Sequence, residues 1–189
     1  MYGWNLFDYI HARNISSGVS NWKHLVAQMM RCTVPGGYVE LSEMEIKAHC
    51  DDGSMKADNG LKIYVEHLRE SMRKMGRQIV DANLLKNLLE EAGFEDIQTF
   101  KAVEPVGPWP KDPKLKKIGA MTLLHTDGVF ESYGMAAFSR VLGMDNKQVR
   151  DICERARLDS LNKNSHIYCV YYRVYGRKPM TMSMATRRY

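Results

Sequence analysis

The sequence predicts an α/β fold, and two observations lead to this prediction. The stretch from Leu6 to Glu43 reads as a complete strand, helix and strand unit. Further on, helical periodicity alternates with short apolar runs, and the run richest in β-branched and aromatic residues, HIYCVYYRVY, lies at 166–175. Strands that alternate with helices are typical of a largely parallel sheet, to which the last two strands can add an antiparallel edge.

The first unit supplies two parallel strands and the helix that connects them. Leu6 to Ala12 is an apolar run typical of a strand buried on both faces. Ser20 can cap the following helix. Pro35, Gly36 and Gly37 would stop that helix, and Tyr38 to Ser42 would form the second strand beside the first. The apolar residues of the helix recur on one stripe: Trp22, Leu25, Val26, Met29 and Met30.

The remaining elements follow from periodicity, capping signals and β propensity. In chain order we expect a helix over 61–80, a helix from 81 or 83 to 92 closed by Gly93, a strand over 96–103, two helices within 113–142, a helix from a capping box at 145 and 148 to about 161, and a strand over 166–175.

Length and composition indicate one globular domain. A chain of 189 residues with 44% hydrophobic and 26% charged residues can bury a substantial core without disulfides. The four cysteines show no CxxC spacing, so we interpret them as reduced thiols of a cytoplasmic protein. No apolar run approaches the roughly 20 residues of a membrane span, so no membrane partner is expected.

The net charge of +5 does not predict nucleic-acid binding. Residues 176–189 carry four basic side chains and no acidic one, which leaves +1 for the other 175 residues. A charge excess confined to a basic C-terminal tail, which we expect to be disordered, is weak support for a surface that follows phosphates. The sequence contains no HExxH, GxSxG, Walker loop or CxxC, so no metal site is expected either.

Several segments, taken in order, resemble the later half of fungal LaeA-like S-adenosylmethionine-dependent methyltransferases, a class I family. The resemblance runs from Phe7 to Pro179, and the GPWPKDP stretch is its most specific part. The segments are FDYIHARN, WKHLVAQMMRCTVPGGYVELSE, LLKNLLEEAGFEDI, PVGPWPKDPKLKKIG, FSRVLGM and YYRVYGRKP.

The resemblance implies a partial Rossmann-like methyltransferase sheet, strands four to seven of seven, with a helical lid insertion. It places a truncated domain at 1–175, the lid insertion at about 104–144 and the basic tail at 176–189. The cofactor would be S-adenosyl-L-methionine. The family's earlier half carries a glycine-rich cofactor loop, whereas this sequence has no GxG and is expected to begin at the fourth strand.

The resemblance also suggests residues for the site. His11, at the carboxyl end of the first strand, is the candidate general base, because an imidazole near neutral pKa accepts a hydroxyl proton. His11, Arg13 and Asn14 would contact the cofactor. The alternatives are that His11 only hydrogen-bonds the backbone of its turn and that the loop is simply solvated.

Three side chains in the insertion, Trp109, His125 and Tyr133, are candidates for contact with an aromatic or polycyclic small-molecule substrate. Each could equally form the core of the lid.

The leading functional hypothesis is O-methylation of a fungal secondary metabolite, a polyketide or a polyketide-peptide hybrid. The alternatives are a noncatalytic partner or regulator derived from a LaeA-like methyltransferase, and an incomplete gene model. The strand Leu6 to Ala12 would lack the neighbouring strand that the family's earlier half supplies, which leaves one edge of the sheet open. We therefore expect a homodimer across this edge or a partner that supplies the missing half.

Overall fold

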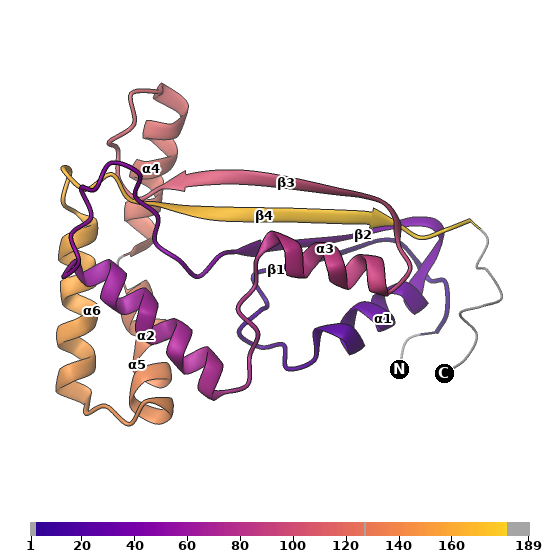
Figure 1. Cartoon of the computed structure of the whole chain (residues 1–189), viewed down its shortest axis with the longest axis horizontal. Coiled ribbons are helices and arrows are strands. Elements are labelled where there is room, and N and C mark those ends of the chain that lie inside the picture. Colours follow the sequence, from indigo (N-terminus) through magenta and orange to yellow (C-terminus); the bar gives the residue numbers. More distant parts are fainter. Residues whose placement is uncertain (1–2, 127, 181–189) are drawn as a thin grey trace. The chain divides into compact units, whose positions relative to one another are not determined.

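The computed structural model describes residues 3–126 and 128–180, and the side chain of His125 lies outside the described part. The chain divides into two compact units (Figure 1). The sheet unit comprises Met1–Met44, Val80–Lys101 and Tyr172–Tyr189, and the helical unit comprises Glu45–Ile79 and Ala102–Tyr171. Each unit is described by itself below.

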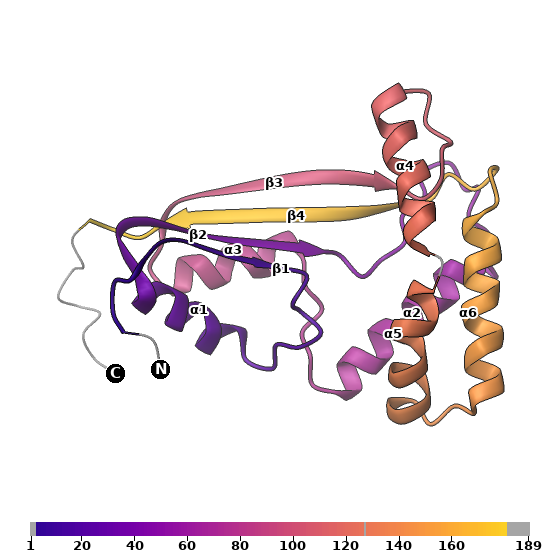
Figure 2. The same ribbon diagram turned by 180° about the vertical axis from the view of Figure 1, so that it is seen from behind.

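The strands form a four-stranded sheet in the order β1-β2-β4-β3. β1 is parallel to β2, and His11 stands opposite Glu40. β4 lies between β2 and β3 and runs opposite to both (Figure 2). The α/β prediction with four strands and an antiparallel last pair is therefore confirmed. The strands are β1 (Phe7–Arg13), β2 (Thr33–Met44), β3 (Glu95–Pro105) and β4 (Tyr168–Arg177).

Two helices, α1 (Trp22–Cys32) and α3 (Ala82–Glu91), cover one face of the sheet (Figures 1 and 2). Their apolar stripes pack against strand residues that point to that face, and together they form the core of the sheet unit. Asp81 caps α3, as expected, by accepting a hydrogen bond from the Leu84 N–H. Core side chains that are fully buried include Val26, Val39, Leu41, Leu85, Leu89 and Val174.

Three details of the strand, helix and strand stretch from Leu6 to Glu43 differ from the predictions. β1 is not buried on both faces, because only its even-numbered residues Ile10 and Ala12 join the core under the helices. Asn21, not Ser20, caps α1, since its side-chain oxygen accepts the His24 N–H at 2.9 Å. The segment at 35–37 does not separate the helix from the strand, because β2 already begins at Thr33.

The 35–37 segment forms a bulge in β2. Phe7 to Tyr9 spans two steps of β1, while their partners Thr33 and Tyr38 are five residues apart. Gly36 has φ +81°, a conformation that side chains rarely adopt. The bulge is held by backbone bonds in which the Gly36 N–H donates to the Lys178 carbonyl and the Lys178 N–H to the Gly37 carbonyl.

The helical unit contains α2 (Gly60–Lys74), α4 (Pro113–Thr126), α5 (Val129–Ala136), a π-helical turn η1 (Ala137–Val141) and α6 (Asn146–Ser160). Two helices within 113–142 were predicted, and α4 and α5 confirm them. The capping box of Asp145 and Gln148 at the start of α6 is also confirmed. α2 ends before the predicted residue 80, because Gly76 takes a left-handed conformation.

β4 continues to Arg177, two residues beyond the predicted end of this strand, and Lys178 is only 2% exposed. The Lys178 ammonium donates to Asn5 Oδ1 at 2.9 Å and to the carbonyls of Met30 and Thr33 at 2.7 Å each. Lys178 thus satisfies carbonyls at the end of α1 that the helix itself leaves open. No helix among residues 3–126 and 128–180 has the length and hydropathy required to cross a bilayer.

We predict that Lys178→Met lowers the free energy of unfolding by about 1–3 kcal/mol, the cost of leaving buried carbonyls without donors. Urea denaturation of purified protein measures the change. Lys101→Met, at an exposed position of β3, is the matched control and should change stability by less than about 0.5 kcal/mol. Equal stability of Lys178→Met and the control would contradict this role.

Candidate functional site

His11 lies on β1 with its imidazole on the sheet face away from α1 and α3. Its Nδ1 is 3.1 Å from Glu40 Oε1 and 3.4 Å from the Tyr9 hydroxyl oxygen. Glu40 Oε1 is also 3.5 Å from Arg173 Nε. We call Tyr9, His11, Glu40 and Arg173 the His11 group. Because a carboxylate holds Nδ1, the ring orientation is fixed and Nε2 is left to act on a ligand.

Burial and Glu40 together determine the pKa of Tyr9 in this group. Partial burial and the negative charge of Glu40, together with a hydrogen bond to it, raise the pKa of the Tyr9 hydroxyl. Tyr9 therefore stays neutral and can donate a hydrogen bond. The alternative in which His11 only bonds the backbone of its turn is not what the structure shows, since the contacts of its ring are with side chains.

Arg13 and Asn14 follow at the carboxyl end of β1, where their side chains are exposed. The Asn14 N–H donates to the Ser42 carbonyl at 3.0 Å, and Asn14 has φ +52°. Buried Glu43 fixes the loop, because its carboxylate accepts the N–H groups of Ile15 at 2.8 Å and Ser16 at 3.4 Å. Glu43 was missed by sequence reasoning. In open parallel sheets ligands bind beyond the carboxyl ends of the strands, and this loop follows the carboxyl end of β1.

Trp109 belongs to a second polar group, in the helical unit. Its indole N–H donates to the Ile167 carbonyl at 3.0 Å, and its ring stacks on His166 with centroids 5.0 Å apart. His166 Nδ1 pairs with the Asp52 carboxylate. Hydrogen bonds from Ser54, and then from Cys50 and His166, hold the pKa of Asp52 well below its ordinary value. We call Asp52, Trp109 and His166 the His166 group.

Of the other predicted substrate residues, Tyr133 on α5 exposes 60% of its surface, and the side chain of His125 lies outside the described part. Tyr133 is not part of the His166 group. The described residues therefore do not assemble Trp109 and Tyr133 into one aromatic site. Trp109 instead contacts His166, which local sequence patterns could not identify, because its partner Asp52 is 114 positions away in the sequence.

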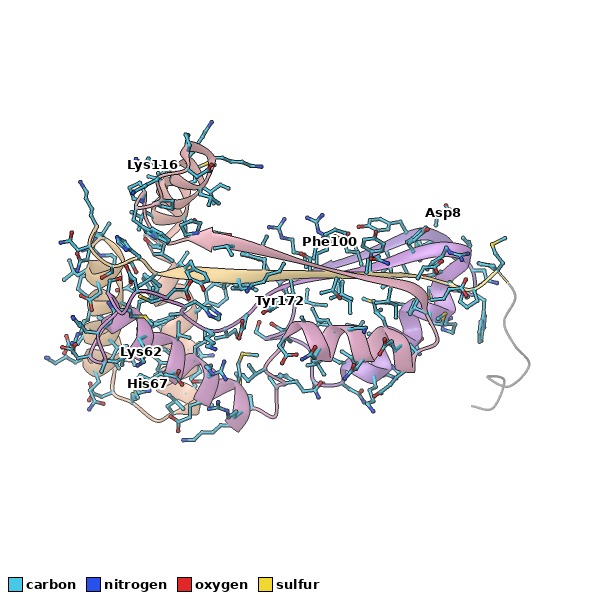
Figure 3. All side chains as sticks on the ribbon, turned by 45° about the horizontal axis from the view of Figure 1, so that its top comes forward. Asp8, Lys62, His67, Phe100, Lys116 and Tyr172 are labelled. Atoms are coloured by element: carbon cyan, nitrogen blue, oxygen red, sulfur yellow. The ribbon has the colours of Figure 1, made fainter. Side chains whose placement is uncertain are left out.

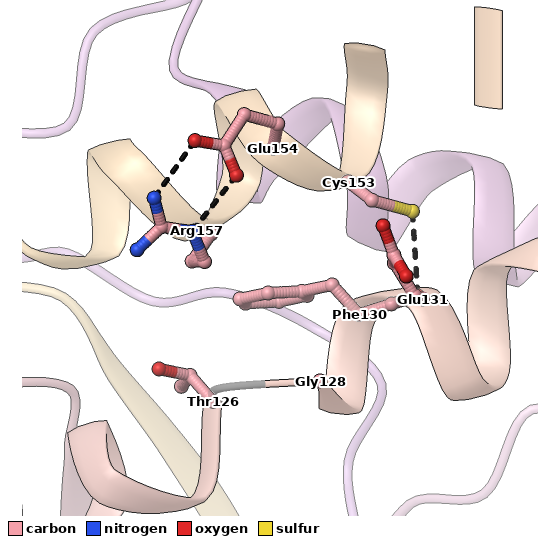
Figure 4. A pocket seen from close by; sticks show the side chains of 7 residues that line it. All are labelled: Thr126, Gly128, Phe130, Glu131, Cys153, Glu154 and Arg157. Atoms are coloured by element: carbon pink, nitrogen blue, oxygen red, sulfur yellow. Dashed lines mark hydrogen bonds and ion pairs between the residues drawn. The ribbon is translucent and has the colours of Figure 1, made fainter. Parts of the chain in front are cut away.

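A small pocket of about 240 Å³ lies in the helical unit between the α4–α5 connection, α5 and α6 (Figure 4). Pockets for drug-sized ligands are about 300–1,000 Å³, so this one can take a fragment but not a polycyclic metabolite. Its wall carries the ion pair of Glu154 and Arg157 at 2.7 Å. The lining residues are Thr126, Gly128, Phe130, Glu131, Cys153, Glu154 and Arg157.

Comparison with known proteins connects the chain to methyltransferases. A family profile described as "Methyltransferase domain" matches residues 4–99. The methyltransferase pytC of Aspergillus terreus is 27% identical over 92% of this chain and 53% of its own length. The secondary metabolism regulator LAE1 of Cochliobolus heterostrophus is 31% identical over 88% of this chain and 55% of its own length.

Among solved structures, the phosphoethanolamine N-methyltransferase 2 of Haemonchus contortus, in complex with S-adenosyl-L-methionine, matches with a TM-score of 0.51 at 14% identity. The match covers 95% of this chain and 35% of that one. At this identity the likeness shows the fold alone, and it supports the Rossmann-like assignment of the sheet. The chain spans about half the length of the curated relatives it matches.

We predict that the buried thiols of Cys153 and Cys169 stabilise the folded chain less as the pH rises from 9 to 11. Burial and the charge of Glu131 raise the pKa of the Cys153 thiol to about 11, and burial raises that of Cys169 to about 12. The unfolded chain releases these protons near the ordinary value of 9.0. A thiol whose pKa is raised by folding stabilises the folded chain below the unfolded pKa and loses this effect as the pH approaches the folded one.

Urea unfolding at pH 8, 9 and 10 measures the effect. Burial lowers the pKa of the Lys178 ammonium, which makes stability rise with pH just below the ordinary lysine value of 10.5. The thiol contribution must therefore be isolated by comparison with Cys153→Ala, which should lose less stability over this range than the unmodified chain. Identical pH slopes for the two proteins would contradict the prediction.

Proposed function

The chain belongs to the methyltransferase domain family, and from this premise we propose that it takes part in S-adenosylmethionine-dependent methylation in fungal secondary metabolism. We propose further that the acceptor is a hydroxyl oxygen of a polyketide or a polyketide-peptide hybrid. The observation that carries the proposal is the family match over residues 4–99, supported by the relatives pytC and LAE1.

Arg13 and Asn14 are the residues of this chain that would hold the cofactor. The guanidinium of Arg13 suits a carboxylate, and the amide of Asn14 can both donate to and accept from an adenine edge. Both side chains are exposed at the carboxyl edge of the parallel strands, on a loop fixed by Glu43. When bound, S-adenosylmethionine supplies the electrophilic methyl group.

His11 is the proposed general base. Glu40 holds Nδ1 at 3.1 Å, so Nε2 would accept the proton of the acceptor hydroxyl. This arrangement favours oxygen as the acceptor, because a neutral amine already carries its lone pair, whereas a hydroxyl gains nucleophilicity when its proton is removed. Arg173, whose Nε is 3.5 Å from Glu40 Oε1, helps to hold this carboxylate in place.

Calorimetry with S-adenosylhomocysteine is the first test of this function, and micromolar affinity is expected. The second is transfer of labelled methyl from S-adenosylmethionine to hydroxylated polyketides and polyketide-peptide hybrids. Affinity without transfer to any acceptor would refute the acceptor class. Absence of both would favour the alternative that the chain is a noncatalytic partner or regulator derived from a methyltransferase.

The location and assembly of the protein also belong to this proposal. We place the protein in the cytoplasm, in keeping with four cysteines that form no disulfide. Among residues 3–126 and 128–180 the strand β1 pairs with β2 alone, and an open edge of this kind tends to pair with another strand. A homodimer across β1, or a partner that pairs there, would show by light scattering as a mass above 21.7 kDa.

We predict that His11→Asn lowers turnover by about 100-fold or more while leaving cofactor affinity nearly unchanged, as expected when a general base is lost. Initial rates and calorimetry on the same preparation separate the two quantities. His24→Asn, an exposed position on α1, is the matched control and should retain full turnover. Unchanged turnover in His11→Asn would reassign the residue to a structural role.

A further inference from the structure

The His166 group of the helical unit takes no part in the methyl transfer proposed for His11. Its imidazole is nevertheless held by several separate contacts. Nδ1 of His166 pairs with the Asp52 carboxylate, and one face of the ring stacks on Trp109 with centroids 5.0 Å apart. The backbone N–H of the same residue donates to Ser54 Oγ at 2.8 Å. The direction of Nδ1, the plane of the ring and the position of the backbone are therefore each fixed.

Asp52 determines which ring nitrogen of His166 is free. Hydrogen bonds from Ser54, followed by those from Cys50 and His166, hold its pKa well below the ordinary value, so the carboxylate is ionised and can only accept. Nδ1 of His166 must therefore carry the shared proton, and in the neutral imidazole Nε2 is an acceptor. In the part of the chain at 3–126 and 128–180, Nε2 has no hydrogen-bond partner, and the side chain is 42% exposed. A ligand can reach this acceptor.

The backbone fastens the loop between β2 and α2 to β4, so the imidazole is not needed for that purpose. His49 and Tyr168 form an antiparallel bridge with N to O distances of 2.9 and 3.0 Å. The Glu45 N–H donates to the Val170 carbonyl at 2.9 Å. An exposed ion pair between side chains adds little stability by comparison. A fixed ring with an open nitrogen is, in contrast, what a binding site requires.

A second pair of stacked rings lies beside His166. This residue stands two positions before Tyr168, where β4 begins, so the two side chains share one side of the chain. Tyr168 stacks on His49 with centroids 5.2 Å apart, as Trp109 stacks on His166. Figure 3 shows Tyr172, four residues further along in the same alternation, on the side of β4 that faces α3. We call His49, Trp109, His166 and Tyr168 the ring patch, and all four belong to the helical unit.

The charges beside the ring patch select the kind of ligand. Asp51 accepts the Tyr168 hydroxyl at 2.9 Å, and Asp52 pairs with His166, so an anionic ligand is repelled there. An ammonium ligand finds both carboxylates already hydrogen-bonded, whereas a neutral hydroxyl finds an open acceptor in Nε2. A phenol is the best neutral donor, because its proton is far more acidic than that of an alcohol, and its flat ring can pack against the neighbouring rings.

We propose that the ring patch and Asp52 form a binding site for a neutral hydroxylated aromatic molecule, whose phenolic hydroxyl donates a hydrogen bond to Nε2 of His166. Asp52 is the positioning residue, because it acts through the imidazole. The site goes beyond the proposed function, since it lies within the helical unit and uses neither S-adenosylmethionine nor His11. Binding forms and breaks no covalent bond, and the hydroxyl keeps its proton.

Protection of His166 from diethyl pyrocarbonate tests the site on the full chain. The reagent acylates an unprotonated ring nitrogen that it can reach, and mass spectrometry of peptides measures the rate for each histidine. The probe is resorcinol, which carries phenolic hydroxyls, and its dimethyl ether is the matched compound without a donor. Resorcinol at about twice its dissociation constant should slow acylation of His166 about threefold and leave exposed His24 unchanged. The dimethyl ether should protect neither residue.

Substitutions separate the acceptor from its positioning residue. His166→Phe keeps a ring to stack on Trp109 and removes the acceptor, so the saturation-transfer NMR signal of resorcinol should disappear. Asp52→Asn should weaken resorcinol binding about tenfold, the scale seen when the group that orients a histidine is lost. Asp151→Asn, an exposed aspartate of α6 that pairs with Lys147, is the matched control and should bind as the unmodified chain does. Circular dichroism confirms that each variant is folded.

Equal protection by the dimethyl ether would show that the hydroxyl is not recognised, and the proposal is then wrong. Absence of protection by resorcinol at its highest soluble concentration also overturns it. Benzylamine, a cation at neutral pH, does the same if it protects His166 in place of resorcinol, because carboxylates would then be the binding groups. A His166 ring that the reagent does not acylate has no accessible Nε2, which contradicts the proposal directly. Resorcinol binding that survives both His166→Phe and Asp52→Asn is a further contradiction.

Discussion

The parallel register of β1 against β2 is the constraint on which the proposed site depends. It places His11 opposite Glu40 and Arg13 opposite Ser42, so that the imidazole meets its carboxylate and the following loop reaches Glu43. A slip of one residue would turn His11 toward α1 and bring Ile10 to the exposed face. The pairing is protected against such a slip, because Ile10 and Ala12 are part of the core under the helices. The packing of Ile10 and Ala12 on the face under the helices therefore fixes the pairing of His11 with Glu40 on the opposite face.

Local signals in the sequence were sufficient for most elements but not for their burial. The capping box of Asp145 and Gln148 and the cap at Asp81 depend on neighbours within three residues, and both were found. The double-sided burial of β1 was wrong, because an apolar run is the same whether one face or both are covered. The burial of Lys178 could not be predicted either. Its ammonium donates to the backbone carbonyls of Met30 and Thr33, and every residue has such a carbonyl.

Long-range pairing explains what was missed at the site. Sequence reasoning named His11 as a candidate base, but its pairing with Glu40 depends on the sheet register. His166 was assigned no role, and the fold brings it to Asp52 and under the ring of Trp109. Each unit thus contains a histidine whose Nδ1 is held by a carboxylate. They differ in surroundings, because the His11 ring lies on an open sheet face while an indole covers one side of the His166 ring.

The bulge in β2 divides that strand into a part that pairs with Phe7 and a part that pairs with β1 from Tyr9 onward. The extra residues at 35–37 loop out between Phe7 and Tyr9 and are tied to the backbone of Lys178, while the strand resumes its regular pairing at Tyr38. The bulge accommodates the extra residues of β2 and leaves His11 opposite Glu40 in the regular pairing that follows. Two neighbouring strands of the sheet can therefore differ in length and still keep the imidazole and the carboxylate within hydrogen-bonding distance.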